Sequence, residues 1–332
     1  MAHYHGYPRQ NEHNDGFGSL HEEEADYGLP FNNVRTMVVG VSKDVDRQKE
    51  TAYIRTSPRI KRLPFGLTFL LDSGGYFPLG FIFFSWLYNS IFVPYIVLHP
   101  QYNDENINIY AVIVYYFFSL FTFVSLFRAT TADPGRVDFE GGPTPPYGAN
   151  DWSLCQKCMV QRPIKSHHCS RCMRCIRKMD HHCPWINNCV GEDNHWLFLL
   201  LVFYAALLSI YTFILQILHF YYFPPCVSCD KSLFIHHNSR WFMYVVFVLA
   251  ILLTIICVGQ VYTQVINIAT SRTTVESIIY AKIPPNRRPT LAKQTSFKNF
   301  KDVFGTSWVI CWLNPFRRRQ AKPMIFYPHQ TV

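Results

Sequence analysis

Four long apolar runs, none of which contains Asp, Glu, Lys or Arg, constrain the fold of this chain more than any other feature. Each run reaches the roughly 20 residues that a helix needs to cross about 30 Å of hydrocarbon. Shorter buried helices of a soluble core are the alternative, but such runs are more typical of membrane spans. We therefore predict an all-α polytopic membrane protein with four transmembrane helices. The runs extend over residues 76–98, 107–127, 196–223 and 241–269.

The distribution of basic residues predicts which side of the membrane each segment faces. Nine Lys or Arg residues precede the first run, nine lie between the second and third, and eleven follow the fourth, whereas the two short loops contain none and two. Basic residues concentrate in cytoplasmic loops, so both chain ends and the segment between the second and third runs are expected to face the cytosol. This asymmetry accounts for the net charge of +9. No basic block is interleaved with a stacking platform, which argues against nucleic-acid binding.

The polarity of the segments around the runs divides the chain into five parts. The N-terminal segment is polar, which is typical of disorder. No cleavable signal peptide precedes the first run, so the first helix is expected to act as the targeting signal. The predicted parts are a disordered cytosolic N-terminal tail (1–65), transmembrane helices 1 and 2 (66–127), a cytosolic cysteine-rich zinc domain (128–195), transmembrane helices 3 and 4 (196–271) and a cytosolic C-terminal tail with a membrane-surface segment (272–332).

Seven of the eleven cysteines lie between Cys155 and Cys189, interleaved with four histidines. The reducing cytosol disfavours disulfides, so closely spaced thiols there are better interpreted as metal ligands or nucleophiles. Six of these cysteines are spaced as ligands of tetrahedral Zn²⁺ sites, several of them separated by two residues. Two sites with four ligands each need eight donors, so two histidines must join the six cysteines. We predict two Cys₃His zinc sites that stabilise a domain of short hairpins and loops. The spacing leaves open which two histidines bind.

The remaining cysteine, Cys183, does not fit the metal-ligand spacing of its neighbours. It follows Asp180, His181 and His182, which offer a base and a carboxylate. A thiol with an ordinary pKa near 8.5 is mostly protonated in the cytosol, and a histidine oriented by a carboxylate activates it as a nucleophile. Cys183 also lies thirteen positions before the third apolar run, hence near the bilayer surface. We therefore predict a catalytic cysteine at the membrane interface.

The cysteine-rich segment resembles that of the DHHC-type protein S-acyltransferases, or palmitoyltransferases, without a gap from Cys155 to Phe198. The matching residues are Cys155, Cys158, His168, Cys169, Cys172, Cys175, Asp180-His181-His182-Cys183, Cys189, Asn194 and Phe198. Further family signatures follow in the same order as in the family, namely Asp133-Pro134-Gly135, Thr273-Thr274-Val275-Glu276, and Asn299 ahead of Val303-Phe304-Gly305. The order and placement of these motifs support the resemblance across the whole membrane region.

The resemblance implies two structural Zn²⁺ ions whose ligands interleave along the chain. The first site comprises Cys155, Cys158, His168 and Cys175, and the second comprises Cys169, Cys172, His182 and Cys189. His182 then has a structural role, whereas Asp180, His181 and Cys183 form the catalytic group. Family resemblance, rather than spacing, assigns the two neighbouring histidines to different tasks.

The family reaction moves a long-chain fatty acyl group, palmitoyl, from acyl-CoA to protein cysteines by a ping-pong mechanism through an acyl-Cys183 intermediate. We expect the acyl chain among the four helices, the thioester at the interface and the nucleotide in the cytosol. Arg162, Lys165 and His167 are candidate contacts for coenzyme A. Three supporting residues are expected, namely Thr274 bracing the aspartate, Asn299 tying the C-terminal tail to the helix ends, and Trp185 beside the acyl carbonyl.

The sequence leaves two alternative functions to consider. A non-catalytic zinc-stabilised membrane scaffold would leave the constellation of Asp180, His181 and Cys183 without a role. Cys226 and Cys229 form a Cys-x-x-Cys pair, but they lack the strand-helix setting of a thioredoxin-like site, so a structural disulfide or two free thiols are favoured over a redox pair.

The resemblance also predicts the partners and the location of the protein. The expected partners are the lipid bilayer, acyl-CoA and cysteine-containing membrane-associated proteins, without nucleic acid, and the sequence does not predict the oligomeric state. The Golgi is the expected membrane, with the endoplasmic reticulum and plasma membrane as alternatives. Cys311, in the C-terminal tail, is expected to be a buried bystander rather than an acylation site.

Overall fold

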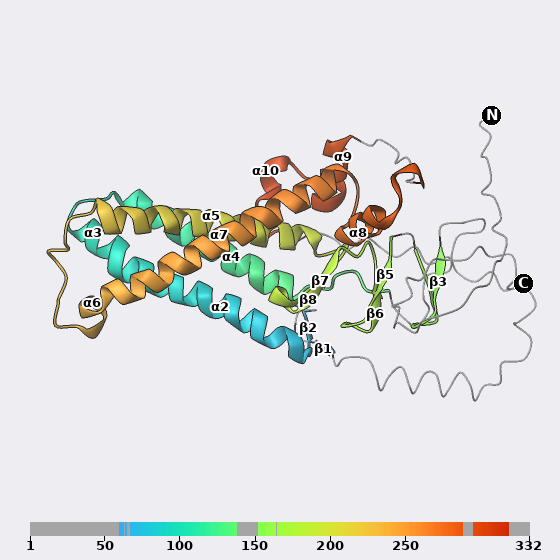
Figure 1. Ribbon diagram of the computed structural model, residues 1–332, viewed down its shortest axis with the longest axis horizontal. Helices are drawn as coiled ribbons and strands as arrows, with labels where there is room; N and C mark the ends of the chain where they lie inside the picture. The colour runs from blue at the N-terminus through green and yellow to red at the C-terminus, as the bar shows by residue number, and fades with distance from the viewer. Residues whose placement is uncertain are drawn as a thin grey trace, which may run out of the picture. The chain divides into compact units, whose positions relative to one another are not determined.

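The computed structural model describes residues 60–62, 64, 67–137, 152–163, 165–287 and 295–318. The tail predicted to be disordered, residues 1–65, lies mostly outside the described residues, as does the end of the C-terminal tail. Long helices and small antiparallel hairpins make up most of the described chain (Figure 1). Among the described residues, four helices are long and apolar enough to cross a membrane, and a hairpin-rich region lies between the second and third of them, which confirms the predicted fold class.

The first span extends beyond its apolar run at both ends and contains a π-helical turn. Asp72 caps α2 (Ser73–Val93) by accepting a hydrogen bond from a backbone N–H in its first turn at 3.2 Å, which satisfies a donor that has no helical partner. Pro94 cannot donate to the helix, and the backbone passes there through η3 (Pro94–Leu98) into α3 (His99–Asn103). The resulting candidate span has 31 residues, Ser73–Asn103.

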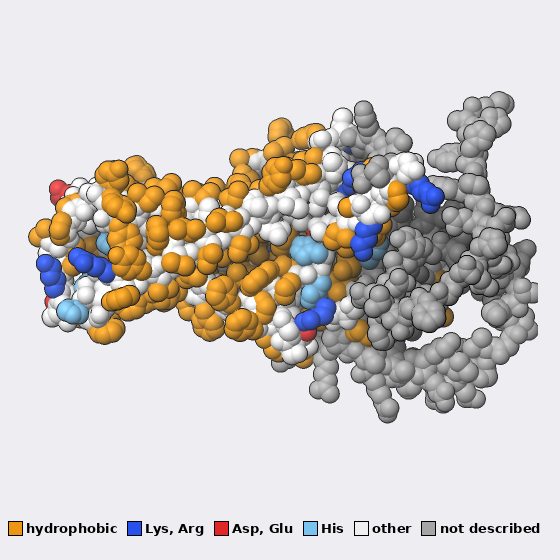
Figure 2. Space-filling model, viewed as in Figure 1, with side chains coloured by type: hydrophobic (Ala, Val, Ile, Leu, Met, Phe, Trp, Pro, Cys, Tyr) orange, Lys and Arg blue, Asp and Glu red, His pale blue; other side chains and the backbone are white. Residues whose placement is uncertain are grey.

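The other three spans begin and end within a few residues of their apolar runs. They are α4 (Ile109–Thr131), α5 (His195–Tyr221) and α7 (Ser239–Ala269). α5 is the most buried because it packs against α4 and also against α7 (Figure 1). The face of the bundle seen in Figure 2 is covered largely with apolar side chains. Phe77, Tyr110 and Ile255 are among the exposed large apolar residues of the bundle. Large continuous apolar surfaces mark contact with lipid or a partner, so this surface suits a bilayer.

In the part of the chain that the structure describes, four two-stranded antiparallel hairpins, each with strands of three residues, lie at one end of the bundle (Figure 1). They are formed by β1 (Ile60–Arg62) with β2 (Thr68–Leu70), β3 (Ser153–Cys155) with β4 (Val160–Arg162), β5 (His167–Cys169) with β6 (Arg174–Ile176), and β7 (His181–Cys183) with β8 (Asn188–Val190). A single hairpin is at best marginally stable in water. The two small cores of this region consist largely of cysteines, with few aliphatic side chains.

The C-terminal segment packs against the same end of the bundle. It contains α8 (Thr274–Lys282), η5 (Pro285–Arg287), α9 (Ser296–Phe304) and α10 (Val309–Trp312). Trp312 is buried and stacks on Phe304 at 5.2 Å, whereas Trp308 and Ile310 are exposed. The segment is therefore a packed cap with an exposed apolar edge. Cys311 is exposed, so the prediction that it is buried was wrong.

At the opposite end of the bundle, Cys226 and Cys229 form a disulfide, one of the two states expected from the sequence. Asp104 accepts hydrogen bonds from the backbone N–H groups of Val227 and Ser228 at 2.8 and 3.1 Å. A short helix, α6 (Phe234–His237), then leads into α7. The carboxylate thus joins the loop between α5 and α7 to the loop between α3 and α4.

Candidate active site

The eight predicted metal ligands form two clusters in the hairpin region. Within each cluster the ligand atoms all lie within 4.8 Å of one another. Sulfurs bound 2.3 Å from one Zn²⁺ would lie about 3.8 Å apart in a tetrahedron, and His182 Nδ1 lies 3.5 to 3.7 Å from its three sulfur neighbours. Both clusters can therefore bind metal ions. They are Cys155, Cys158, His168 and Cys175, and Cys169, Cys172, His182 and Cys189.

The register of β7 and β8 separates the second cluster from the predicted catalytic residues. Antiparallel pairing places His182 opposite Cys189 and Cys183 opposite Asn188. Successive side chains of a strand point to opposite faces. His182 and Cys189 therefore face the cluster, whereas His181 and Cys183 face away from it. Cys183 belongs to neither metal cluster.

Asp180 is fully buried beside His181. Its Oδ2 atom lies 2.7 Å from His181 Nδ1, and Thr274 donates to the carboxylate twice, from its N–H at 2.7 Å and from Oγ1 at 2.9 Å. Gln264 Nε2 donates to Oδ2 at 2.9 Å. Burial raises the pKa of Asp180, but hydrogen bonding to His181 and the other interactions outweigh it and lower the pKa below its usual range. The ionised carboxylate keeps the proton on Nδ1, which leaves Nε2 of His181 for Cys183.

The thiol of Cys183 lies beside this oriented histidine. Burial lowers the pKa of His181, but hydrogen bonds to Asp180 and Cys183 outweigh burial and raise the pKa to about 9. The Phe198 ring packs edge-on against the imidazole with the centroids 5.1 Å apart. The imidazole is therefore placed to take the thiol proton and to hold the resulting positive charge next to a carboxylate.

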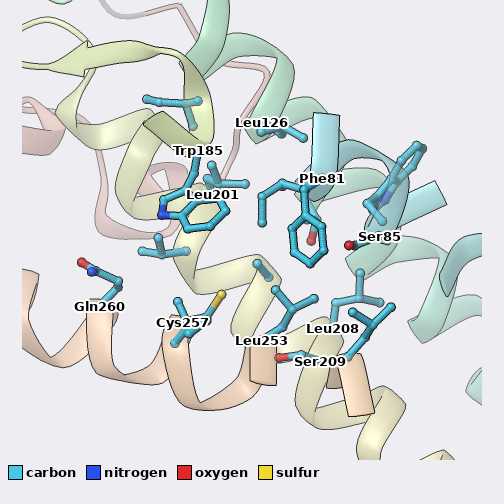
Figure 3. A pocket seen from close by; sticks show the side chains of 18 of the residues that line it. Phe81, Ser85, Leu126, Trp185, Leu201, Leu208, Ser209, Leu253, Cys257 and Gln260 are labelled. Carbon is cyan, nitrogen blue, oxygen red and sulfur yellow. The ribbon is translucent and has the colours of Figure 1, made fainter. Parts of the chain in front are cut away.

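A cavity of about 260 Å³ extends from Cys183 into the helix bundle. Side chains of α2, α4, α5 and α7 line it, and Figure 3 shows Phe81, Leu201 and Leu253 directed into it from three of these helices. The lining of α5 extends from Phe198 to Thr212, about 21 Å at 1.5 Å per residue. Nearly all of this lining is apolar. The cavity suits a long hydrocarbon chain whose reactive end lies at the thiol.

Comparison with known proteins identifies the family. A family model described as DHHC palmitoyltransferase matches residues 149–281. Palmitoyltransferase ZDHHC21 of Mus musculus is 43% identical over 255 residues, which cover 76% of this chain and 93% of the relative. The chain belongs to the DHHC palmitoyltransferase family.

Further DHHC palmitoyltransferases agree with this assignment. ZDHHC21 of Danio rerio is 44% identical over 254 residues, covering 76% of this chain and 94% of the relative. ZDHHC3 of Rattus norvegicus is 32% identical over 244 residues, covering 70% and 78%. The resemblance drawn from the sequence is confirmed. This DHHC protein is a multi-pass membrane enzyme, a protein S-palmitoyltransferase.

The three candidate coenzyme A contacts of this DHHC enzyme lie near one another, and two of them, Arg162 and Lys165, already have partners. Lys165 Nζ lies 3.3 Å from Glu276 Oε2. Burial lowers the pKa of His167, and the charge of Arg162 adds to this effect. Arg162 is itself buried. The Lys165 ammonium also donates to the carbonyl of Ser271 at 2.8 Å, so a third N–H donor is left for a phosphate group.

Two of the residues predicted to support the site lie beside the cavity and at a helix end. Trp185, in η4 (Pro184–Ile186), is about half exposed and borders the cavity, with its ring 6.4 Å from that of Phe81. Asn299 is buried and donates to the carbonyl of Ala269, the last residue of α7, at 3.1 Å. The first residue is therefore at the mouth of the cavity, and the second joins the tail to a helix end.

The sequence analysis missed Gln264, the donor from α7 to Asp180. A signal for it was present, because polar side chains inside membrane spans are costly and often functional. We counted only Asp, Glu, Lys and Arg in the apolar runs, and Gln264 lies in the fourth of them.

Proposed function

We propose that Cys183 carries the palmitoyl group between two thioester exchanges. His181 accepts the thiol proton, the thiolate attacks the carbonyl of palmitoyl-CoA, and the bond from this carbon to the coenzyme A sulfur breaks. Coenzyme A leaves with the proton from His181. A substrate cysteine then gives its proton to His181 and attacks acyl-Cys183, whose sulfur departs and regains that proton. Each half-reaction exchanges one thioester for another, so neither an oxidant nor a reductant is needed.

The observation that carries this proposal is the place where the Asp180-His181-Cys183 group meets the apolar cavity. A palmitoyl chain has about 14 methylenes, and at roughly 0.8 kcal/mol each their removal from water is worth on the order of 11 kcal/mol. Binding of the chain in the cavity would hold the thioester next to the thiol. The polar coenzyme A would remain outside, near Arg162, Lys165 and His167.

We further propose that both Cys₃His clusters hold structural zinc. Three thiolates and one imidazole in tetrahedral spacing form a typical Zn²⁺ donor set. Zinc bound there would supply a cross-link between hairpins. It would also fix β7 through His182, and with it the side chains on the opposite face of that strand, His181 and Cys183.

The proposed orientation places both chain ends, the hairpin region and the active site in the cytosol. The distribution of basic residues supports this topology. A Golgi location, with the endoplasmic reticulum or plasma membrane as alternatives, and membrane-associated cysteine proteins as substrates are the further expectations from the family. The five parts of the chain predicted from the sequence, 1–65, 66–127, 128–195, 196–271 and 272–332, belong to the same proposal.

Transfer from an isolated acyl-enzyme tests the mechanism. The detergent-solubilised protein is incubated with alkyne-tagged palmitoyl-CoA and freed of coenzyme A, and a cysteine peptide anchored in vesicles is then added. We expect a hydroxylamine-sensitive tag on the enzyme that passes to the peptide, and neither event with Cys183→Ser. Transfer only while acyl-CoA is present, or tagging of Cys183→Ser, would contradict the proposal.

A further inference from the structure

A buried chain of hydrogen bonds leads from α5 through α7 to Asp180. His195 Nε2 lies 2.8 Å from Gln264 Oε1, and Gln264 Nε2 lies 2.9 Å from Asp180 Oδ2. His195, at the start of α5, is 9% exposed, Gln264 is 1% exposed and Asp180 is 0% exposed. These three side chains come from different elements, and none of them belongs to a metal cluster.

The carboxylate of Asp180, at one end of this series of hydrogen bonds, determines how the other groups in the series are oriented. An ionised carboxylate can only accept hydrogen bonds, so the Gln264 atom next to Asp180 must be the amide nitrogen. The amide oxygen then faces His195, and because this oxygen can only accept, His195 Nε2 must carry a hydrogen. If His195 could not donate there, a reversed amide would place its oxygen against the carboxylate. His195 therefore fixes which end of Gln264 meets Asp180.

We propose that Gln264 is a positioning residue for acyl transfer and that His195 sets its orientation. Gln264 supplies one of the hydrogen bonds that keep Asp180 Oδ2 directed at His181 Nδ1. The same amide nitrogen lies 3.5 Å from Thr274 Oγ1, which itself donates to Oδ2. The role of Gln264 is thus to brace the carboxylate from the helix bundle, as Thr274 does from α8.

The inference rests on the proposed function, since it assigns a supporting role to the group that acylates Cys183. A merely structural glutamine would affect folding or metal content, whereas a positioning residue affects the rate of the chemical step. A substitution at Gln264 should therefore change the maximal acylation rate but not the acyl-CoA concentration that gives half of that rate.

The test measures single-turnover acylation of Cys183 over a range of alkyne-tagged palmitoyl-CoA concentrations. Gln264→Leu should lower the maximal rate about tenfold to 100-fold, because a hydrogen bond to a charged group is lost, with half-saturation unchanged within about twofold. Gln216→Leu is the matched control: Gln216 is equally buried, on α5, and its amide meets Met243 rather than the active site. Its rate should equal that of the wild type.

A rate of wild-type size for Gln264→Leu, or a change in half-saturation alone, would overturn the inference and leave the proposed function standing. Absence of acylation in the wild type would overturn both. A second pair of variants decides the matter if Gln264→Leu fails to fold. His195→Gln keeps an N–H donor and should retain most of the rate, whereas His195→Leu should fall toward that of Gln264→Leu. Equal rates for the two His195 variants would contradict the proposal.

Discussion

The hairpin region and the helix bundle hold their shapes by different chemistry. The bundle buries aliphatic and aromatic side chains of α4, α5 and other helices, whereas cysteines predominate in the hairpin cores. Three-residue strands bury little apolar surface, so metal–sulfur bonds have to replace hydrophobic burial. Cys183 lies on a hairpin strand but packs in the core of the bundle with Trp196 and Phe198. Both regions therefore position the nucleophile, and a substitution that disrupts either region should lower the reactivity of Cys183.

Loss of a metal ligand should have the largest effect, because it removes the main support of the hairpins. We expect Cys172→Ala to lower the zinc content below two ions per chain and to abolish acylation. The helix content measured by circular dichroism should stay near that of the wild type. Limited proteolysis should cut within residues 152–190. A control is Cys311→Ala, an exposed cysteine of α10 outside both clusters and the cavity. Normal zinc and activity in Cys172→Ala would disprove the assignment of this ligand.

Removal of the charge on Asp180 should have the next largest effect on the acylation rate and should leave the metal sites intact. Asp180→Asn can place an amide N–H against His181 and favour the wrong tautomer, and a comparable change in another triad lowers the rate about 10⁴-fold. We expect a loss of about 10³-fold or more in the acylation rate with two zinc ions retained. A loss of less than tenfold would show that His181 does not depend on this carboxylate.

Thr274 offers a smaller and more selective test of the same carboxylate. Thr274→Val removes the Oγ1 donor and keeps the backbone N–H donor, so the rate should fall about 10- to 100-fold. Thr274→Ser restores a hydroxyl and should recover most of the activity. Single-turnover acylation with both variants measures the effect. A serine variant as slow as the valine variant would assign the loss to packing of the methyl group.

A change within the bundle should alter acyl selectivity rather than the rate of the chemistry. Ala250, a small buried residue of α7, lines the cavity in its deeper half, away from Cys183. Ala250→Phe should shorten the usable cavity and shift the preference from 16-carbon toward 12- or 14-carbon acyl-CoA by about tenfold, the order expected from a few methylenes in an apolar pocket. Competition between donors of different length measures this shift. An unchanged preference would place the acyl chain elsewhere.

The smallest effect is expected at the hairpin surface, at Lys165. Its ion pair with Glu276 is partly exposed, and such pairs contribute about 0 to 1 kcal/mol. Lys165→Ala should leave the melting temperature nearly unchanged and raise the half-saturating acyl-CoA concentration a few-fold. Lys178→Ala, which removes a comparable pair with Glu192, should change neither quantity. Equal behaviour of the two variants would remove Lys165 from the coenzyme A contacts.

Much of the architecture followed from the sequence because its signals are local. The absence of charge over 20 or more residues predicted all four spans, although the π-helical turn at Pro94 and the extension of the first span to Asn103 depend on packing. Spacing predicted two Cys₃His sites but could not assign His181 and His182. That assignment depends on strand alternation in β7, which exists only once the hairpin has formed.

The remaining features of the site depend on contacts between distant segments. Gln264 reaches Asp180 across 84 positions of the chain, and no local pattern marks such a pair. The cavity likewise depends on the rotation of four helices about their axes. Cys311 was predicted to be buried because its neighbours in the sequence are apolar. In the structure Trp312 packs on Phe304, whereas Cys311 is exposed.

The most direct test of the central claim counts zinc ions and acyl groups on the same purified protein. The account predicts two zinc ions and one acyl group in the wild type, and two zinc ions and no acyl group in Cys183→Ser. That result would mean that one sulfur of the seven is free for chemistry. Loss of a zinc ion from Cys183→Ser, or an acyl group that persists on it, would contradict the account.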